Sequence, residues 1–182
     1  MSNKANLLVF VICMCLLFFS SVHATAKEGA AMHIISTAFE NNEIIPKKYT
    51  CDGQNVSPPL NWAGVPAGAK SITIICDDPD APMGTWIHWV IYGISPDAAS
   101  LPENVPPQKE VLRGAKQGIN DFKKIGYGGP CPPKGPAHRY FFKIYALDIE
   151  LNLPAGASKK DVEKAMQGHI LAEGQLVGKY GR

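Results

Sequence analysis

Short apolar segments alternate along the chain with connections rich in proline and glycine. Residues 71–76 alternate between apolar and smaller polar side chains, the pattern of a strand with one buried face. Residues 86–94 and 138–147 are apolar at nearly consecutive positions, which is typical of strands covered on both faces. A further strand pattern occupies residues 32–39. We therefore predict a strand over each of these four segments.

The connections between these segments indicate how the strands are arranged. Proline and glycine concentrate in residues 57–59, 79–82, 102–107 and 126–136. Short strands with such connections favour an all-β architecture over alternating strands and helices. We predict a mainly β fold, an antiparallel β-sandwich with a few peripheral helices.

One helix is predicted near the C-terminus. Ser158 can cap the free amides of its first turn while Asp161 reaches back to the Ser158 amide, an arrangement called a capping box. Gly174 should end the apolar pattern, and residues 175–180 can return as a short final strand. The apolar face of this helix is predicted from residues at three- and four-residue spacing: Val162, Ala165, Met166, His169 and Ile170.

The N-terminus has the pattern of a secretion signal. Residues 7–19 form an unbroken apolar run, shorter than the roughly 20 residues that span a bilayer. Val22 and Ala24 stand at the minus-three and minus-one positions of a signal-peptidase site. We predict a signal peptide over residues 1–24 and a single domain over residues 25–182, which implies a periplasmic or secreted protein with no transmembrane segment after cleavage.

Charge excludes some partners and leaves others open. The 182 residues carry 18 basic and 16 acidic side chains, a formal net charge of +2, with no run of like charges. A nucleic-acid-binding protein usually clusters basic residues on one face, so the sequence favours no nucleic-acid partner. We expect no cofactor, and a homodimer is compatible with the sequence.

Three of the five cysteines lie after the predicted cleavage site. Cys76 alternates with isoleucines in a predicted strand and is expected to be a small buried hydrophobic residue. Cys51 and Cys131 lie in predicted loops, and an oxidising compartment favours their pairing. We predict a Cys51–Cys131 disulfide. The spacing of the three residues does not fit a metal site, so we expect none.

Residues suited to chemistry gather in three segments: 77–82, 86–89 and 128–140. Two prolines stiffen the first segment and hold its carboxylates in place. His88 interrupts an otherwise apolar strand, on the face predicted to be shared by Trp86, Val90 and Tyr92. In the third segment His138 and Tyr140 are two residues apart on a strand, so their side chains point to one face.

Structural roles are the more common explanation for each of these residues taken alone. A single histidine in a buried strand is more often a satisfied core residue than a ligand. Asp78 and Asp80 beside prolines are ordinary turn residues. Tyr140 can be a core aromatic, and Lys134 a solvated loop charge.

A family resemblance favours the functional interpretation of these residues over the structural one. Asp-Pro-Asp-Ala-Pro at 78–82 followed by Trp-x-His at 86–88, and Gly-Pro-Cys-Pro-Pro-Lys-Gly at 129–135 followed by His-Arg-Tyr at 138–140, resemble the two signature blocks of the phosphatidylethanolamine-binding protein family. Within the family they are most similar to the bacterial Raf-kinase-inhibitor-like branch. The resemblance extends in the same order to residues 51–60, 64–66, 120–122 and 169–172.

The resemblance implies a β-sandwich with a small anion pocket at one end. Histidine Nε2, the Tyr140 hydroxyl and the amides of Gly129 and Cys131 are candidate donors. Asp78 is expected to accept from an imidazole Nδ1–H and so to fix which nitrogen meets the ligand. The nearby carboxylate disfavours a dianion unless a histidine is protonated, so binding should strengthen below neutral pH. The implied ligand-binding residues are Asp78, Asp80, Ala81, Pro82, Trp86, His88, Cys131, Pro133, His138 and Tyr140.

Three functions follow as hypotheses. The leading one is a binding protein for phosphate esters or phospholipid headgroups, not an enzyme. A second is an inhibitor-like regulator of a kinase or protease partner, which the resemblance permits. The alternative is a hydrolase that uses His88 or His138 as general base. Against it, no nucleophile is poised beside a base: two prolines follow Ser57, Ser71 begins a strand, and neither Gly-x-Ser-x-Gly nor His-Glu-x-x-His occurs.

Overall fold

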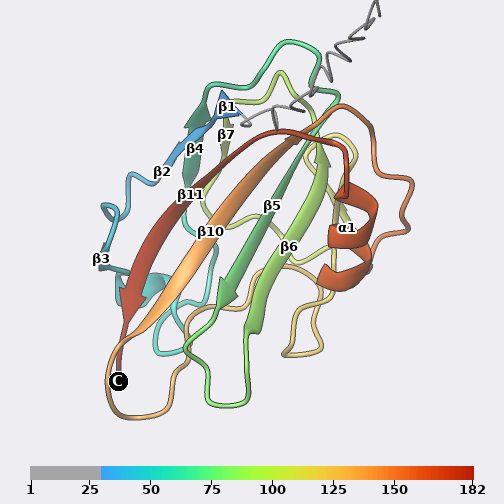
Figure 1. Cartoon of the computed structure of the whole chain (residues 1–182). Coiled ribbons are helices and arrows are strands. Elements are labelled where there is room, and N and C mark those ends of the chain that lie inside the picture. The colour runs from blue at the N-terminus through green and yellow to red at the C-terminus, as the bar shows by residue number, and fades with distance from the viewer. Residues whose placement is uncertain (1–29) are drawn as a thin grey trace, which may run out of the picture.

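The computed structural model describes residues 30–182, which form two β-sheets and two short helices (Figure 1). The large sheet has eight strands in the order β1-β11-β10-β5-β6-β9-β8, and β3 also pairs with β11. Its strands are β1 (Ala30–Ala31), β3 (Glu43–Ile44), β5 (Ser71–Asp78), β6 (Trp86–Ile94), β8 (Glu110–Val111), β9 (Ala115–Gln117), β10 (His138–Leu147) and β11 (Ile170–Tyr180). The small sheet has the order β2-β4-β7, with β2 (His33–Ile35), β4 (Leu60–Ala63) and β7 (Ser100–Leu101). The helices are the 3-10 turn η1 (Lys47–Tyr49) and α1 (Lys159–Met166).

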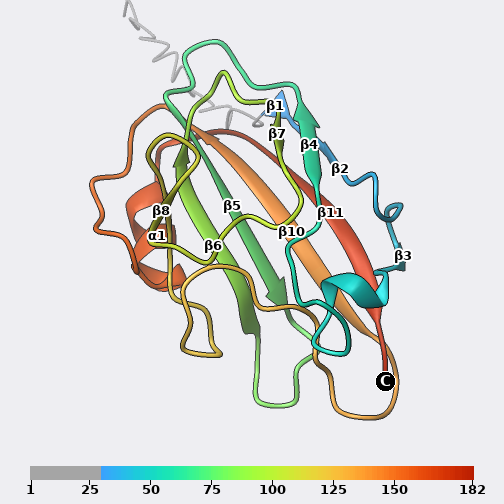
Figure 2. The same ribbon diagram turned by 180° about the vertical axis from the view of Figure 1, so that it is seen from behind.

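The large sheet lies between two other layers. Helix α1 covers one face along β6, and the small sheet lies behind the other face (Figures 1 and 2). Trp89 and Ile91 of β6 belong to the core between the sheets, whereas Val90 and Tyr92 belong to the core beneath α1. This double burial explains why residues 86–94 are apolar at consecutive positions.

The mainly β sandwich is confirmed, and β6 and β10 have the bounds predicted from the sequence. Strand β5 extends two residues beyond the predicted segment, to Asp78. The opening strand is shorter than predicted, since β2 covers only His33–Ile35. Not all pairings are antiparallel: β1 and β3 both pair with β11 in parallel. Short edge strands at the start of the domain account for this difference.

The capping box at the predicted helix is present. Ser158 Oγ accepts from the Asp161 amide at 3.2 Å, and Asp161 Oδ2 accepts from the Ser158 amide at 3.2 Å. The predicted extent was wrong, however, because α1 ends at Met166 and β11 begins at Ile170.

Gly174 lies inside β11 and does not end an element. A Cβ at this position would collide with the backbone carbonyl of Met32, whose amide donates to Glu173 O at 2.8 Å. Glycine therefore marks a close approach of two backbones at this position.

Four strands bring distant segments together at one end of the large sheet, the lower end in Figure 1. Asp78 at the end of β5 pairs with Trp86 at the start of β6. His138 at the start of β10 pairs with Tyr180 at the end of β11. The loops that leave these strands therefore converge at this end.

The Cys51–Cys131 disulfide is present, with Cα atoms 5.4 Å apart, as predicted. Cys76 is a free, fully buried thiol in β5. The predicted signal peptide, residues 1–24, lies outside the described residues. Between residues 30 and 182, no helix has the length and apolar character needed to cross a membrane.

Candidate functional site

A cavity of about 350 Å³ lies at the end of the large sheet where these loops converge. Its wall is mostly apolar, with one carboxylate and two imidazoles as its ionisable groups. Within the part of the chain that the structure describes, no lysine or arginine lines it. The lining residues are Asp78, Ala81, Pro82, Met83, Trp86, His88, Phe122, Cys131, Pro132, Pro133 and His138.

A β-bulge places His88 in this cavity. Cys76 on β5 pairs with Trp89 on β6, whereas the next residue, Asp77, pairs with Ile87. His88 is therefore an additional residue without a partner on β5. A bulge of this kind bends the strand and changes the direction of the extra side chain.

The bulge overturns the predicted environment of His88. Val90 and Tyr92 pack in the core beneath α1, on the opposite side of the sheet from the cavity. The His88 ring instead contacts Tyr140 edge-to-face, with centroids 5.1 Å apart, and Tyr140 belongs with Trp89 to the core between the sheets. The predicted face shared with Val90 and Tyr92 was wrong, because strict alternation fails where two residues oppose one.

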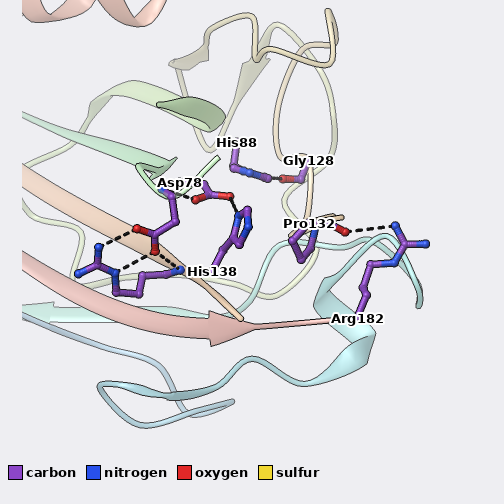
Figure 3. Close-up of polar contacts among 8 residues, drawn as sticks. Asp78, His88, Gly128, Pro132, His138 and Arg182 are labelled. Carbon is purple, nitrogen blue, oxygen red and sulfur yellow. Dashed lines mark hydrogen bonds and ion pairs between the residues drawn. The ribbon is translucent and has the colours of Figure 1, made fainter. Parts of the chain in front are cut away.

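Asp78 and His138 form the polar pair of the cavity and point toward one another (Figure 3). Asp78 Oδ2 lies 2.8 Å from His138 Nδ1, and Asp78 Oδ1 accepts from the Asp80 amide at 2.8 Å. The carboxylate is a hydrogen-bond acceptor, so His138 Nδ1 carries the hydrogen. Within residues 30–182, the remaining nitrogen, Nε2, has no protein partner. This geometry lets Asp78 orient the His138 ring, and the expectation that Nε2 of this ring meets a ligand stays a prediction.

His88 is held by the loop that follows β9. Its Nδ1 lies 2.6 Å from the carbonyl oxygen of Gly128, and the Gly128 amide donates to the His88 carbonyl at 2.8 Å (Figure 3). Burial lowers the pKa of His88, although the Gly128 carbonyl and the Asp78 charge act in the opposite direction. His88 is only 2% exposed, so the neutral ring is the favoured form.

Tyr140 lies beneath the cavity wall. It is fully buried, and its hydroxyl has no hydrogen-bond partner among the described residues. Burial, followed by the charge of Asp78, raises the pKa of the phenol well above its usual value. The hydroxyl therefore stays protonated. Its expected role as a donor to the ligand stays a prediction.

Asp80 also lies off the wall and anchors the loop after β5. Its carboxylate accepts from Arg139 Nε at 2.9 Å, from Arg139 Nη2 at 2.7 Å and from the Arg139 amide at 2.9 Å. These bonds to Arg139 hold the pKa of Asp80 at about 2. The bidentate pair fastens the loop that carries Ala81 and Pro82 to the start of β10.

The opposite wall comes from the loop that the disulfide ties to residue 51. Cys131, Pro132 and Pro133 line the cavity, and Pro132 O accepts from Arg182 Nη1 at 3.4 Å on the outer side (Figure 3). The Gly129 amide was expected to meet an anion, but it donates to Asn55 Oδ1 at 2.7 Å. That expectation was wrong, because the amide is already used in a hydrogen bond that holds the loop in place.

The structure brings together most of the residues predicted for the site. Asp80 and Tyr140 are the two that do not line the cavity. The sequence prediction missed Met83, Phe122 and Pro132. Pro132 lies inside the motif at 129–135 and Phe122 in the supporting segment 120–122, so the sequence offered a signal for both. Met83 lies between the motifs at 78–82 and 86–88, and only its position next to them pointed to it. Those on the wall are Asp78, Ala81, Pro82, Trp86, His88, Cys131, Pro133 and His138.

The arrangement offers two imidazole nitrogens to a small polar group in apolar surroundings. Each ring uses Nδ1 on a protein acceptor, so Nε2 is the nitrogen available to a ligand. Among residues 30–182, no group of three or more His, Cys, Asp or Glu side chains is placed to hold a metal ion.

Comparison with known proteins identifies the same family that the sequence motifs resemble. The profile of the family described as "Phosphatidylethanolamine-binding protein" matches residues 35–181. A "UPF0098 protein" of Methanothermobacter thermautotrophicus is 55% identical over 151 residues, which cover 83% of this chain and 99% of the relative. A "UPF0098 protein" of Aquifex aeolicus is 55% identical over 156 residues, which cover 85% of this chain and 91% of the relative.

Two solved structures share the fold. The putative phosphatidylethanolamine-binding protein homolog CT736 of Chlamydia trachomatis has a TM-score of 0.77 at 42% identity, covering 84% of this chain and 99% of its own. YbcL of E. coli, described as a member of the mammalian PEBP family, has a TM-score of 0.79 at 32% identity, with the same coverage. With a profile match over nearly the whole described domain and relatives above half identity, the chain belongs to the phosphatidylethanolamine-binding protein family.

Proposed function

We propose that this protein binds small anions, such as phosphate and phosphate monoesters or headgroups, in the cavity between Asp78, His88 and His138, outside the cytoplasm. Family membership supports a ligand-binding protein. The observation that carries the anion proposal is the Asp78–His138 pair on a mostly apolar wall.

A proton on His138 gives Nε2 a hydrogen to donate, and the Asp78 carboxylate 2.8 Å from Nδ1 compensates the positive charge. The pair is nearly buried, with side-chain exposures of 12% for His138 and 4% for Asp78. A charge-assisted hydrogen bond in such surroundings is stronger than one in water. Among residues 30–182 no lysine or arginine lines the wall, so the anion depends on the positive charge that a proton gives to this ring.

The size of the cavity favours a small ligand or the head of a larger one. About 350 Å³ is near the lower limit of ordinary ligand sites. A phosphate with a short substituent fits this volume, and a diacyl lipid would have to leave its chains outside.

Calorimetric titration with inorganic phosphate at pH 6 tests the proposal. We expect saturable binding to wild-type protein and a loss of about tenfold or more in the His138→Ala variant, because a charged donor is removed. Lys134→Ala, which changes an exposed loop charge, is the matched control and should leave the affinity unchanged. No binding to wild-type protein, or equal binding to His138→Ala, would contradict the proposal.

A hydrolase is the second candidate, because an imidazole held by a carboxylate is also the geometry of a general base. None of the lining residues is a serine, a threonine or a free thiol, and Cys131 is in the disulfide. Water would therefore have to be the nucleophile. Steady turnover of aryl phosphates or esters that disappears in His138→Ala would support this candidate.

An inhibitor-like role towards a kinase or protease, and a homodimer, stay predictions. Capture of partners from an extracytoplasmic extract would test the first, and light scattering of the purified protein would test the second.

A further inference from the structure

The two imidazoles of the cavity differ in what they can offer a ligand. The Gly128 carbonyl oxygen can only accept, so the hydrogen in its 2.6 Å bond with His88 must come from His88 Nδ1. The Gly128 amide also donates to His88 O, which fixes this carbonyl in place. In a neutral imidazole one nitrogen carries the hydrogen and the other accepts. Neutral His88 therefore presents an Nε2 that accepts.

The surroundings of His88 favour the neutral ring. The charged or titratable groups near it are Asp78, Asp121, His138 and Tyr140, and burial keeps the Tyr140 phenol protonated. Each carboxylate is already engaged: Asp78 with His138 and the Asp80 amide, and Asp121 with the Ile87 amide at 2.7 Å. Neither carboxylate forms a hydrogen bond with the His88 ring.

The ring of His88 also lies between two aromatic side chains. Tyr140 and Phe122 contact it edge-to-face, with centroid distances of 5.1 and 5.4 Å. With 2% of the residue exposed, water cannot solvate an imidazolium there. His138 differs in both respects, since its ring lies 2.8 Å from the Asp78 carboxylate, which can compensate a positive charge, and its side chain is 12% exposed.

We propose that the cavity selects oxyanions that carry a proton of their own, the hydrogen-phosphate form of phosphate and of its monoesters, over phosphate diesters and sulfate. This inference rests on the proposed anion binding at the same cavity. The P–OH group donates to His88 Nε2, while an anionic oxygen accepts from protonated His138 Nε2. The accepting nitrogen of His88 then has a donor, and the donating nitrogen of His138 has an acceptor.

Ligands without a proton leave this arrangement unsatisfied. A sulfate ester places an anionic oxygen, and a diester an anionic or ester oxygen, against the lone pair of His88 Nε2. Two acceptors then face each other at a histidine that is only 2% exposed. Sites built to bond a particular hydroxyl strongly reject analogues that lack it, so we expect at least about tenfold weaker binding.

Three small anions of equal charge give a direct test. Near pH 5.5, below the second phosphate pKa of about 6, methyl phosphate is mostly a monoanion with one P–OH. Methyl sulfate has the same shape and charge without the proton, and dimethyl phosphate replaces the proton by a methyl group. Calorimetric titration should show methyl phosphate binding at least about tenfold more tightly than either.

The outcomes separate this inference from the function on which it rests. Comparable binding of methyl phosphate and methyl sulfate, within about threefold, would overturn the selection and leave anion binding intact. Binding of none of these anions, nor of inorganic phosphate, would overturn both.

Two variants of His88 identify the group responsible. His88→Gln can keep a donor toward Gly128 and an acceptor toward the cavity, so it should retain the preference for methyl phosphate. His88→Leu has no acceptor, and the ratio of affinities should fall to about threefold or less. An unchanged ratio in His88→Leu would overturn the assignment.

Nitrogen NMR gives a readout that does not depend on either variant folding. Long-range proton–nitrogen spectra of wild-type protein should show His88 with hydrogen on Nδ1 and none on Nε2 before methyl phosphate is added. A cationic His88 ring, or one with hydrogen on Nε2, would overturn the inference.

Discussion

Asp77 and Asp78 are neighbours on β5 and both are almost entirely buried, yet they lie on opposite faces of the sheet in different surroundings. The Asp77 side chain is 1% exposed and lies on the face that α1 covers. The Asp78 side chain is 4% exposed and lines the cavity. Burial alone therefore does not distinguish a structural carboxylate from one at a ligand site.

The partners of Asp77 are two lysines. Lys143 Nζ on β10 and Lys159 Nζ on α1 both lie 2.9 Å from Asp77 Oδ2. Burial opposes the charge of Lys159, but its bonds with Asp77 and Glu163 prevail and raise its pKa. This group therefore keeps its charge throughout the ordinary pH range and fastens the helix to the sheet.

Asp78 has instead an imidazole as its partner, and that ring has a second nitrogen available to a ligand. The comparison shows what to look for in a buried carboxylate: an imidazole partner beside an opening indicates a binding site, and lysine partners under a helix indicate a structural role.

The largest expected effect is a loss of folding stability when Asp77 is replaced. Asp77→Ala leaves two lysine charges without their partner, and breaking a buried pair usually costs several kcal/mol. Since Lys143 and Lys159 are 31% and 20% exposed, we expect a smaller loss of about 1.5–3 kcal/mol in the free energy of unfolding. Urea unfolding measures it.

Glu163→Ala is the matched control for that experiment, because it removes an exposed partner of the same lysine. Its effect should stay below about 0.5 kcal/mol. If Asp77→Ala were as mild as this control, the structural role assigned to Asp77 would be wrong.

A pH titration of stability tests the neutral state of His88. Burial lowers the pKa of His88 in the folded protein. At pH values between this lowered pKa and about 6.5, His88 is therefore protonated in the unfolded chain and neutral in the folded protein. The contribution of His88 is therefore complete above pH 6.5 and declines as pH falls, by at most about 1.4 kcal/mol per pH unit.

His88→Gln does not titrate, so its unfolding free energy should decline less steeply than that of wild-type protein between pH 6.5 and 5. Chemical denaturation at several pH values compares the two slopes. Parallel curves would show that His88 is not held neutral by the fold.

The smallest effect is expected at Tyr140. Its hydroxyl is buried without a partner, and deleting such a group is often neutral or slightly stabilising. Tyr140→Phe should change the unfolding free energy by less than about 1 kcal/mol and phosphate affinity by no more than about twofold. A tenfold loss of affinity would show that the hydroxyl reaches the ligand, as the family resemblance suggests.

Local signals predicted much of this molecule. The capping box at Ser158 and the doubly covered strand over residues 86–94 each depend on residue type and on neighbours close in sequence. The Cys51–Cys131 pair joins residues 80 positions apart, but it was predicted from the local setting of each cysteine, two in loops and Cys76 in a strand. These features are confirmed by the structure.

What the sequence could not predict depends on register between distant strands. The bulge at His88 arises because Cys76 pairs with Trp89 while Asp77 pairs with Ile87, and periodicity along β6 contains no trace of that shift. The need for glycine at position 174 also depends on a distant segment, because only the approach of the Met32 backbone leaves no room for a side chain there.

The most direct test of the account compares phosphate binding in Asp78→Asn and Asp77→Asn, two identical changes at adjacent buried positions. Asp78→Asn lowers the local negative charge, which alone would favour an anion, but it removes the carboxylate that orients and compensates protonated His138. We expect orientation to prevail, so calorimetry at pH 6 should show affinity falling about tenfold in Asp78→Asn and staying within about twofold of wild type in Asp77→Asn. Unchanged or tighter binding in Asp78→Asn, with the fold intact, would contradict the central claim that the Asp78–His138 pair holds the ligand.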